Sequence, residues 1–113
     1  MKVPQNAIIP QANLTQYLLI FKPRNDKSKF LAQAGFTLEN WPALEVAIQD
    51  LIMTAEAFKD EEDEYGTFYR VEGEIIGTNN RKLSIITIWL QRKIDNQFQF
   101  ITLKPRKELR SEP

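Results

Sequence analysis

The side chains of this sequence that could work on a phosphate group are basic residues and tyrosines. Arginine and lysine stabilise a charged phosphoryl transition state, and a tyrosine with a perturbed pKa can donate or accept a proton. RNA cleavage by such groups does not require histidine. The candidates are a basic segment that contains Lys22, Arg24, Lys27 and Lys29, together with Arg70, Arg81, Tyr65 and Tyr69. The basic segment, residues 22–29, is compact enough to act as a unit, although the commoner role of such a segment is a solvated loop.

Other catalytic constellations are absent from the sequence. It has no cysteine and no histidine, which excludes disulfides, thiol nucleophiles, Ser-His-Asp triads and most zinc sites. Glu72 and Glu74 lie about 7 Å apart on one strand face, a spacing that can suit sugar hydrolysis. Beside Arg70 they are more typical of a solvated polar face. The acidic run 60–64 lacks the D-x-D-x-D-G pattern of calcium loops and suits an edge strand. We therefore expect no metal and no cofactor.

Composition places the chain among globular proteins of one domain. Its 113 residues are 42% hydrophobic and 27% charged, which is ordinary for a folded domain. Fifteen basic residues balance fifteen acidic ones, so no global field attracts nucleic acid or an anionic membrane. The sequence shows no apolar run long enough for a secretory signal or a bilayer span. We expect a cytoplasmic protein without membrane contact.

Helical patterns occupy the first half of the chain. A short helix that ends before Pro23 is expected through Tyr17, Leu18 and Leu19. Ser28 is expected to cap a helical turn over 29–34, which Gly35 ends in the left-handed conformation. The strongest helical pattern starts near Pro42 and carries an apolar stripe of Leu44, Ala47, Ile48, Leu51, Ile52 and Ala55. This amphipathic helix must lay one side against a flat or concave surface.

The second half of the chain has the alternating pattern of strands. Alternation is cleanest over 67–76, and turn residues follow it. Helices followed by strands predict an α+β fold of two layers, with N-terminal helices packed on one face of a three- to four-stranded antiparallel meander. Residues 1–103 are expected to form this single domain, and 104–113 a polar, frayed tail. The expected strands are 56–61, 67–76, 83–90 and 98–103.

The third expected strand is apolar on both faces. One face carries Leu83, Ile85, Thr87 and Trp89, and the other carries Ile86, Ile88 and Leu90. Trp89 is expected to be a core residue. Because a half-solvated antiparallel sheet has one polar face, the second apolar face needs a cover. That cover is either the N-terminal elements with a curled sheet, or a homodimer or partner interface at Ile86, Ile88 and Leu90.

Several short motifs in a fixed order resemble a small, uncharacterised bacterial domain family. They span roughly residues 8–103 and are Tyr17-Leu18-Leu19, the stretch from Lys27 to Phe36, Tyr65-Gly66 with Tyr69, Gly77 with Arg81, and Thr87-Ile88-Trp89. That family resembles, more distantly, the layout of barnase-like and colicin-type ribonuclease toxin domains. This resemblance implies that Lys27, Tyr65, Tyr69, Arg81 and Trp89 are the positions to inspect for RNA cleavage.

Two functions from different classes remain open from the sequence. The first is a non-catalytic protein-interaction module, which can be a homodimer through Ile86, Ile88 and Leu90. The second is a metal-independent ribonuclease-like or RNA-binding domain that uses the basic segment and the tyrosines. We favour the first at this stage, because balanced charge and missing histidine give no positive evidence for chemistry.

Overall fold

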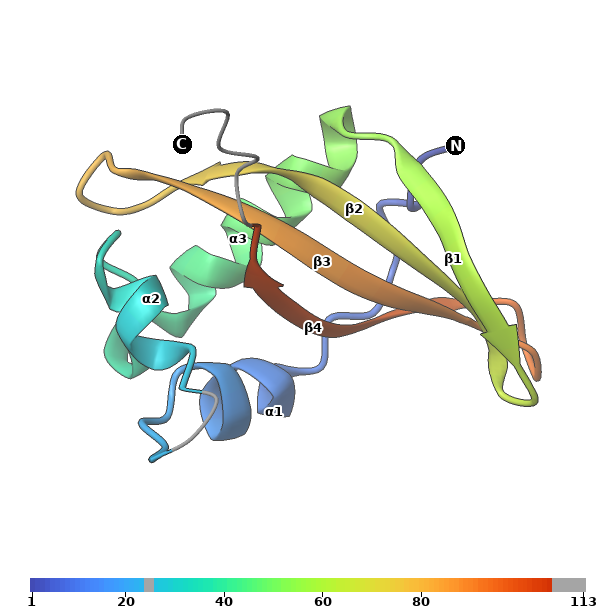
Figure 1. The fold of residues 1–113 in the computed structure, drawn as a ribbon, viewed down its shortest axis with the longest axis horizontal. Helices are drawn as coiled ribbons and strands as arrows, with labels where there is room; N and C mark the ends of the chain where they lie inside the picture. The colour runs from blue at the N-terminus through green and yellow to red at the C-terminus, as the bar shows by residue number, and fades with distance from the viewer. Residues whose placement is uncertain (24–25, 107–113) are drawn as a thin grey trace, which may run out of the picture.

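The chain folds into helices followed by a four-stranded antiparallel sheet, which confirms the α+β prediction (Figure 1). The computed structural model describes residues 1–23 and 26–106. The helical part consists of α1 (Gln11–Asn13), the π-helical turn η1 (Leu14–Leu18), α2 (Ser28–Ala32), the 3-10 turn η2 (Leu38–Asn40) and α3 (Trp41–Thr54). The strands are β1 (Ala57–Asp63), β2 (Gly66–Ile76), β3 (Lys82–Arg92) and β4 (Phe98–Pro105).

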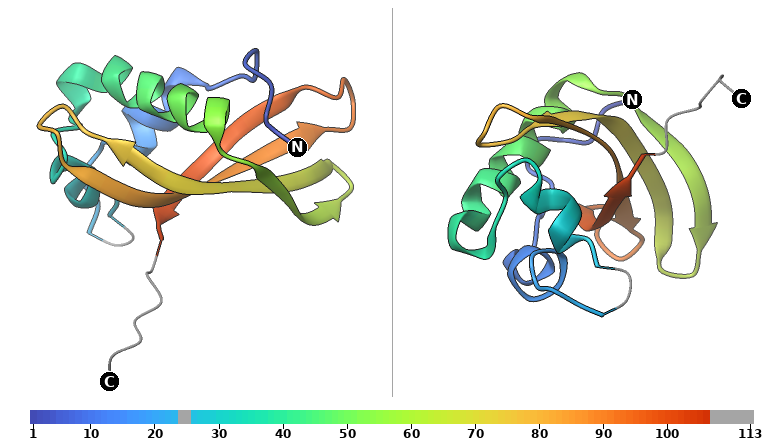
Figure 2. Two further views of the ribbon diagram at one scale, coloured as in Figure 1. Left: turned by 90° about the horizontal axis from the view of Figure 1, so that it is seen from above. Right: turned by 60° about the vertical axis from the view of Figure 1, so that its left-hand side comes forward.

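The long helix α3 provides the cover for one face of the sheet (Figure 2). Its apolar stripe is buried as predicted, with Leu44, Ala47, Ile48, Leu51 and Ile52 in the core. Gly73 in the middle of β2 lets the helix approach, because a Cβ there would stand 2.6 Å from Leu51 Cδ1. Helix and sheet therefore share one core, and we refer to the other side of the sheet as the open face.

The strands are ordered β1-β2-β3-β4 along the sheet, each antiparallel to the next. Directly paired residues lie on the same face of a sheet, so the register assigns both faces. Val71 and Ile75 of β2 face the core with Ile85 and Trp89 of β3. The open face holds the other set, which includes Arg70, Glu72, Ile86, Ile88 and Leu90. Figure 1 looks onto this face, and α3 lies behind it.

Trp89 is fully buried, as predicted, and its one polar atom has a partner in the core. The indole Nε1–H donates to Thr87 Oγ1 over 2.8 Å. The Thr87 hydroxyl in turn donates to the Val71 carbonyl oxygen over 2.9 Å. Thr87 is the buried polar residue of this core, with no exposed surface. The pair places two hydrogen bonds between β2 and β3 where water has no access.

The turn between β2 and β3 docks onto the end of α2. Thr78 Oγ1 donates to the Gly35 carbonyl over 3.1 Å, and Asn79 Nδ2 donates to the Gln33 carbonyl over 3.0 Å. Gly35 adopts a positive φ of 87°, which confirms the predicted left-handed end of this helical turn. A Cβ on Gly77 would stand 1.9 Å from the Ala34 carbonyl oxygen. Only a residue without a side chain fits there unless backbone moves.

Two expected boundaries differ from the structure. The last strand continues past Leu103 through Pro105, so the first two residues of the expected tail are strand, and residues 107–113 lie outside the described part. The extension is held by pairing of Pro105 with Ile85, since β4 is an edge strand and tolerates proline. Helix α2 starts at Ser28 rather than after it, because the side chain of Asp26 supplies the acceptor expected from Ser28.

Candidate functional site

Two adjoining hollows meet at Lys27, beside the β4 edge of the open face. The first, of about 410 Å³, is lined by Asn13, Tyr17, Lys27, Ile101 and Thr102. The second, of about 430 Å³, is lined by Tyr17, Asp26, Lys27, Lys104 and Pro105. We call the four side chains Tyr17, Lys27, Thr102 and Lys104 the Lys27 site. They come from η1, the start of α2 and β4.

The side chain of Asp26 fixes the backbone around Lys27. Its Oδ1 accepts hydrogen bonds from the Ser28 hydroxyl at 2.6 Å, the Ser28 amide at 3.1 Å and the Lys22 amide at 3.4 Å. The bond from the Ser28 hydroxyl is the main reason why the pKa of Asp26 lies below its usual range. The ionised carboxylate thus holds Lys22 and Lys27 on one loop, with Lys27 directly before the first turn of α2.

A bulge in β4 brings Thr102 to the open face opposite Lys27. The register shifts so that Trp89 pairs with Phe100 and Ile88 pairs with Thr102, which leaves Ile101 as an extra residue. The side-chain amide of Asn13 donates to the carbonyl oxygens of Phe100 and Ile101, each over 3.0 Å. These bonds satisfy carbonyls at the bulge on the free edge of β4. Lys27 Nζ then donates to Thr102 Oγ1 over 3.2 Å.

The electrostatics of the Lys27 site favour an anion. The pKa of Lys27 is lowered, first by partial burial and then by repulsion from Lys104 and Lys22. Within the described residues, none of these three lysines forms an ion pair. A bound anion would relieve the mutual repulsion of these ammonium groups. Lys22 Nζ lies 3.4 Å from the centroid of the Tyr17 ring, a cation–π contact at the rim of the hollow.

The rest of the open face balances its own charge. Arg70 Nε donates to Glu72 Oε2 over 2.7 Å, and its guanidinium lies 3.9 Å from Asp60 Oδ1. Arg106 approaches the same Glu72 carboxylate at 3.9 Å. Arg70 thus pairs with Glu72, one of the partnerships expected from the alternation. These groups line a further hollow with Ile86 and Lys104, of about 450 Å³, next to the Lys27 site.

The four residues singled out for inspection do not converge. Tyr65 lies in the β1–β2 turn and Arg81 in the β2–β3 turn, at opposite ends of the eleven-residue strand β2. Tyr69 faces the core side, where its ring lies 5.4 Å from that of Phe98. Only Lys27 belongs to the site described above, and Trp89 lies in the core. Arg24, which the sequence grouped with Lys27, lies outside the described residues.

Sequence reasoning missed three members of the site. Tyr17 appeared there only as part of a short helix, and Lys104 only as the first residue of a tail. Thr102 sits 75 residues from Lys27 along the chain, and the β4 bulge decides which face it takes. No spacing in the sequence announces that bulge, although an edge strand next to a compact basic segment was a pattern that could have drawn attention to Lys104.

The apolar residues Ile86, Ile88 and Leu90 are half-buried on the open face and adjoin the Lys27 site. Ile88 pairs with Thr102, and Ile86 pairs with Lys104. Within residues 1–23 and 26–106, α3 packs on the other face, and the N-terminal segment reaches the β4 edge through the Ile8–Gln99 bridge. The N-terminal elements therefore cover the core face and the edge of β4, not the centre of the open face.

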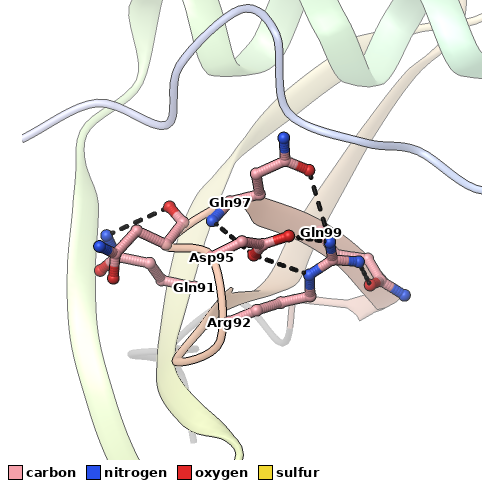
Figure 3. A network of polar contacts seen from close by, with 6 residues as sticks. Gln91, Arg92, Asp95, Gln97 and Gln99 are labelled. Atoms are coloured by element: carbon pink, nitrogen blue, oxygen red, sulfur yellow. Dashed lines mark hydrogen bonds and ion pairs between the residues drawn. The ribbon is translucent and has the colours of Figure 1, made fainter.

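A separate hollow of about 450 Å³ lies at the far ends of the hairpins, lined by Glu64, Tyr65, Leu90, Arg92, Lys93 and Ile94. Arg92 is committed to the β3–β4 turn beside it (Figure 3). Its guanidinium donates to both Asp95 carboxylate oxygens and to Gln99 Oε1. The bond from Arg92 lowers the pKa of Asp95. This network stabilises a turn and leaves no convergent ionisable groups for catalysis in the described part of the hollow.

Metal and membrane sites were examined in the same way. In the described ranges, no group of three or more Asp and Glu side chains is placed to hold a metal ion. The acidic run begins on the edge strand β1, where its Asp60, Glu61, Glu62 and Asp63 are exposed. No helix of the described part is long and apolar enough to cross a bilayer.

Comparison with known proteins gives a family and a fold. A family model described as a domain of unknown function, DUF6883, matches residues 2–107. No curated protein sequence matches the chain. A solved structure titled "Contact-dependent growth inhibition toxin - immunity protein complex from Klebsiella pneumoniae 342" contains a chain of similar fold, with a TM-score of 0.68 and 17% identity. The similarity covers 88% of this chain and 100% of that one. The expected resemblance to an uncharacterised domain family is thereby confirmed.

Proposed function

The chain belongs to the DUF6883 family of unknown function, and from this premise we propose that it is an RNA-cleaving domain that works without a metal ion at the Lys27 site. The observation that carries the proposal is the convergence of Lys22, Lys27 and Lys104, without ion pairs in the described residues, on hollows that also hold the Tyr17 ring and the Thr102 hydroxyl. We place this activity in the bacterial cytoplasm.

A phosphate group fits the charge of the Lys27 site. Three nearby ammonium groups repel one another, and the diester anion of an RNA backbone would offset that repulsion. The cations act most strongly where water is partly excluded, and Lys27 is half-buried. Lys104 and Lys22 bind and stabilise the phosphate in this proposal. The balanced net charge of the whole chain does not oppose this, because the excess of positive charge is local.

The reaction is transfer of the phosphoryl group to the neighbouring ribose hydroxyl. The 2′-oxygen loses its proton and bonds to phosphorus, while the bond from phosphorus to the 5′-oxygen of the next nucleotide breaks and that oxygen gains a proton. Neutral Lys27 accepts the first proton, which its lowered pKa favours. The Tyr17 hydroxyl, beside Lys27 in both hollows, supplies the second. The products are a 2′,3′-cyclic phosphate and a 5′-hydroxyl, with no redox change.

The fold likeness supports the proposal without supplying its residues. The similar chain comes from a complex titled as a toxin with its immunity protein, and a toxin domain requires an activity against a cellular component. An RNA-cleaving domain of this kind would also bind a protein partner that neutralises it. We propose the open face as that partner's surface, since Ile86 and Ile88 border the Lys27 site there.

The experiment is an RNA cleavage assay with the purified chain in excess EDTA. We expect cleavage to persist in EDTA, to fall at least about 100-fold in Lys27→Ala, and to stay unchanged in Lys93→Ala, which removes an exposed lysine at the opposite end of the sheet. An oligonucleotide with deoxyribose at every position should not be cut. Cleavage that needs a metal ion, or that survives loss of the Lys27 amine, contradicts the proposal.

A second candidate is a non-catalytic interaction module, favoured by the half-buried Ile86, Ile88 and Leu90 on the open face. In this form the chain acts by self-association or by binding a protein partner. Sedimentation over a range of protein concentrations tests the homodimer, which should dissociate in Ile88→Glu. A wild-type chain that stays monomeric at high concentration counts against self-association. The absence of RNA cleavage together with a stable dimer would favour this candidate over the first.

A further inference from the structure

Two aromatic side chains next to the Lys27 site are exposed to solvent. Tyr17 is 47% exposed and Phe21 is 63% exposed. Leu14 and Leu18 of the same segment are at most 1% exposed and anchor it in the core. The segment is therefore fixed by its leucines, and its aromatic rings are left outside. Large apolar side chains grouped on a surface mark a binding site more often than a scattered one does.

Lysine ammonium groups accompany both exposed rings. Lys22 Nζ lies 3.4 Å from the Tyr17 centroid, and Lys29 Nζ lies 5.3 Å from the Phe21 centroid. Neither lysine forms an ion pair with a described residue. Aromatic rings interleaved with free cations are what a single nucleic-acid strand requires, because bases stack on the rings while the cations contact the backbone phosphates.

We propose that Tyr17 and Phe21 are a stacking platform that binds single-stranded RNA and leads it into the Lys27 site. This inference rests on the proposed function and assigns the substrate class of the same site. The lysine that now covers each ring is displaced when RNA binds, because an exposed cation–π contact is weaker than the stacking of a base on an aromatic ring. The freed ammonium moves to a phosphate, so both groups gain a partner.

The geometry selects an unpaired strand over a duplex. Bases in a duplex are stacked on one another and offer no free face to a protein ring, whereas unpaired bases can turn outward. Tyr17 lines both hollows of the Lys27 site. A base stacked on Tyr17 therefore has its own backbone next to Lys27 and Lys104. The platform and the lysines form one continuous surface for a short single-stranded segment.

The test is binding of a fluorescein-labelled eight-nucleotide RNA with 2′-O-methyl riboses, measured by fluorescence anisotropy. This probe cannot be cleaved, because it has no free 2′-hydroxyl. We expect Tyr17→Ala and Phe21→Ala each to weaken binding about tenfold. Tyr17→Phe and Phe21→Trp keep a ring and should bind like the wild type. Tyr65→Ala is the matched control, because Tyr65 is 67% exposed but lies in the β1–β2 turn. The probe annealed to its complement should bind more weakly than the single strand.

The outcomes separate this inference from the proposed function. If both alanine variants bind the probe like the wild type while Lys27→Ala abolishes cleavage, the platform is wrong and the cleavage proposal stands. If both variants lose binding but the wild type cleaves no RNA, the platform stands as an RNA-binding surface and the catalytic proposal is wrong. Equal affinity for the duplex and the single strand overturns the inference, as does a wild-type chain that binds neither. Both side chains point to solvent, and circular dichroism checks that the variants fold.

Discussion

The Lys27 ammonium donates a hydrogen bond to the Thr102 hydroxyl over 3.2 Å, and this bond joins the start of α2 to the edge strand β4. The two residues belong to halves of the chain with different architectures, one helical and one a sheet. Their contact gives the open face a basic rim next to an apolar centre. The geometry makes Lys27 the position whose chemistry decides between catalysis and binding alone, because burial and two neighbouring lysines lower its pKa.

The pH dependence of RNA cleavage should follow the titration of Lys27. Its lowered pKa means that the neutral amine, which is the base in our proposal, forms at a lower pH than in an ordinary lysine. The rate should therefore rise with pH and level off below about pH 10.4, the ordinary lysine value. In Lys27→Arg the side chain stays protonated, so RNA binding should persist while this rising limb disappears. A variant with the same pH profile as the wild type would contradict a base at this position.

Replacing Lys27 by methionine should stabilise the folded chain at neutral pH. The folded state holds a partly desolvated ammonium, and methionine fills similar space without that cost. Because the pKa of Lys27 is lower in the folded state, the unfolded state binds more protons between the folded and the unfolded pKa values. Stability of the wild type should therefore rise with pH across that window, and the advantage of Lys27→Met should shrink there. Urea denaturation at pH 7 and pH 10 measures both, with Lys93→Met as control. A methionine variant less stable than the wild type at both pH values would refute the prediction.

The sequence predicted the elements whose evidence is local. The apolar stripe through Ile48 and the alternation around Val71 depend on the periods of a helix and a strand, and both are seen in the structure. The site depends on long-range pairing and could not be read in this way. Thr102 faces Lys27 only because Ile101 is an extra residue in β4, and Tyr65 and Arg81 are separated because one antiparallel strand runs between their turns.

Loss of the Thr87 hydroxyl should destabilise the core despite unchanged volume. Thr87→Val leaves the buried Trp89 indole N–H without its acceptor, which lies 2.8 Å away in the wild type. An unsatisfied buried donor costs about 1–3 kcal/mol. Thr87→Ser keeps the hydroxyl and loses one methyl group, so it should cost about 1 kcal/mol. Chemical denaturation gives both free energies of unfolding. Equal destabilisation by valine and serine would show that the hydrogen bonds contribute little.

A methyl group at Gly77 should be more harmful than one at Gly73. The Gly77 Cβ would stand 1.9 Å from the Ala34 carbonyl oxygen, so backbone has to move and the β2–β3 turn is pushed off α2. At Gly73 the nearest atom, at 2.6 Å, is the end of the Leu51 side chain, which can rotate. We expect Gly77→Ala to cost about 2–3 kcal/mol and Gly73→Ala about 1 kcal/mol, in the range of overpacked cores. Thermal unfolding of the two variants tests the order, and the reverse order would show that the turn moves more easily than Leu51.

Arg81→Ala should leave RNA cleavage unchanged, although the resemblance to ribonuclease toxin domains placed Arg81 among the positions to inspect. Arg81 is exposed in the β2–β3 turn, and its backbone amide bonds to the Asn79 side chain. Lys27→Ala removes the same unit of positive charge from the β4 edge. If cleavage depended on total charge, both variants would lose activity equally, and added salt would enhance neither difference. We expect only the Lys27 variant to lose activity and to show a weaker salt dependence of binding, by about 0.7 in the slope of log K against log salt for each lost phosphate contact on a single strand. Kinetics and binding at several salt concentrations decide between the two cases, and equal losses would mean that the Lys27 site is not where RNA is held.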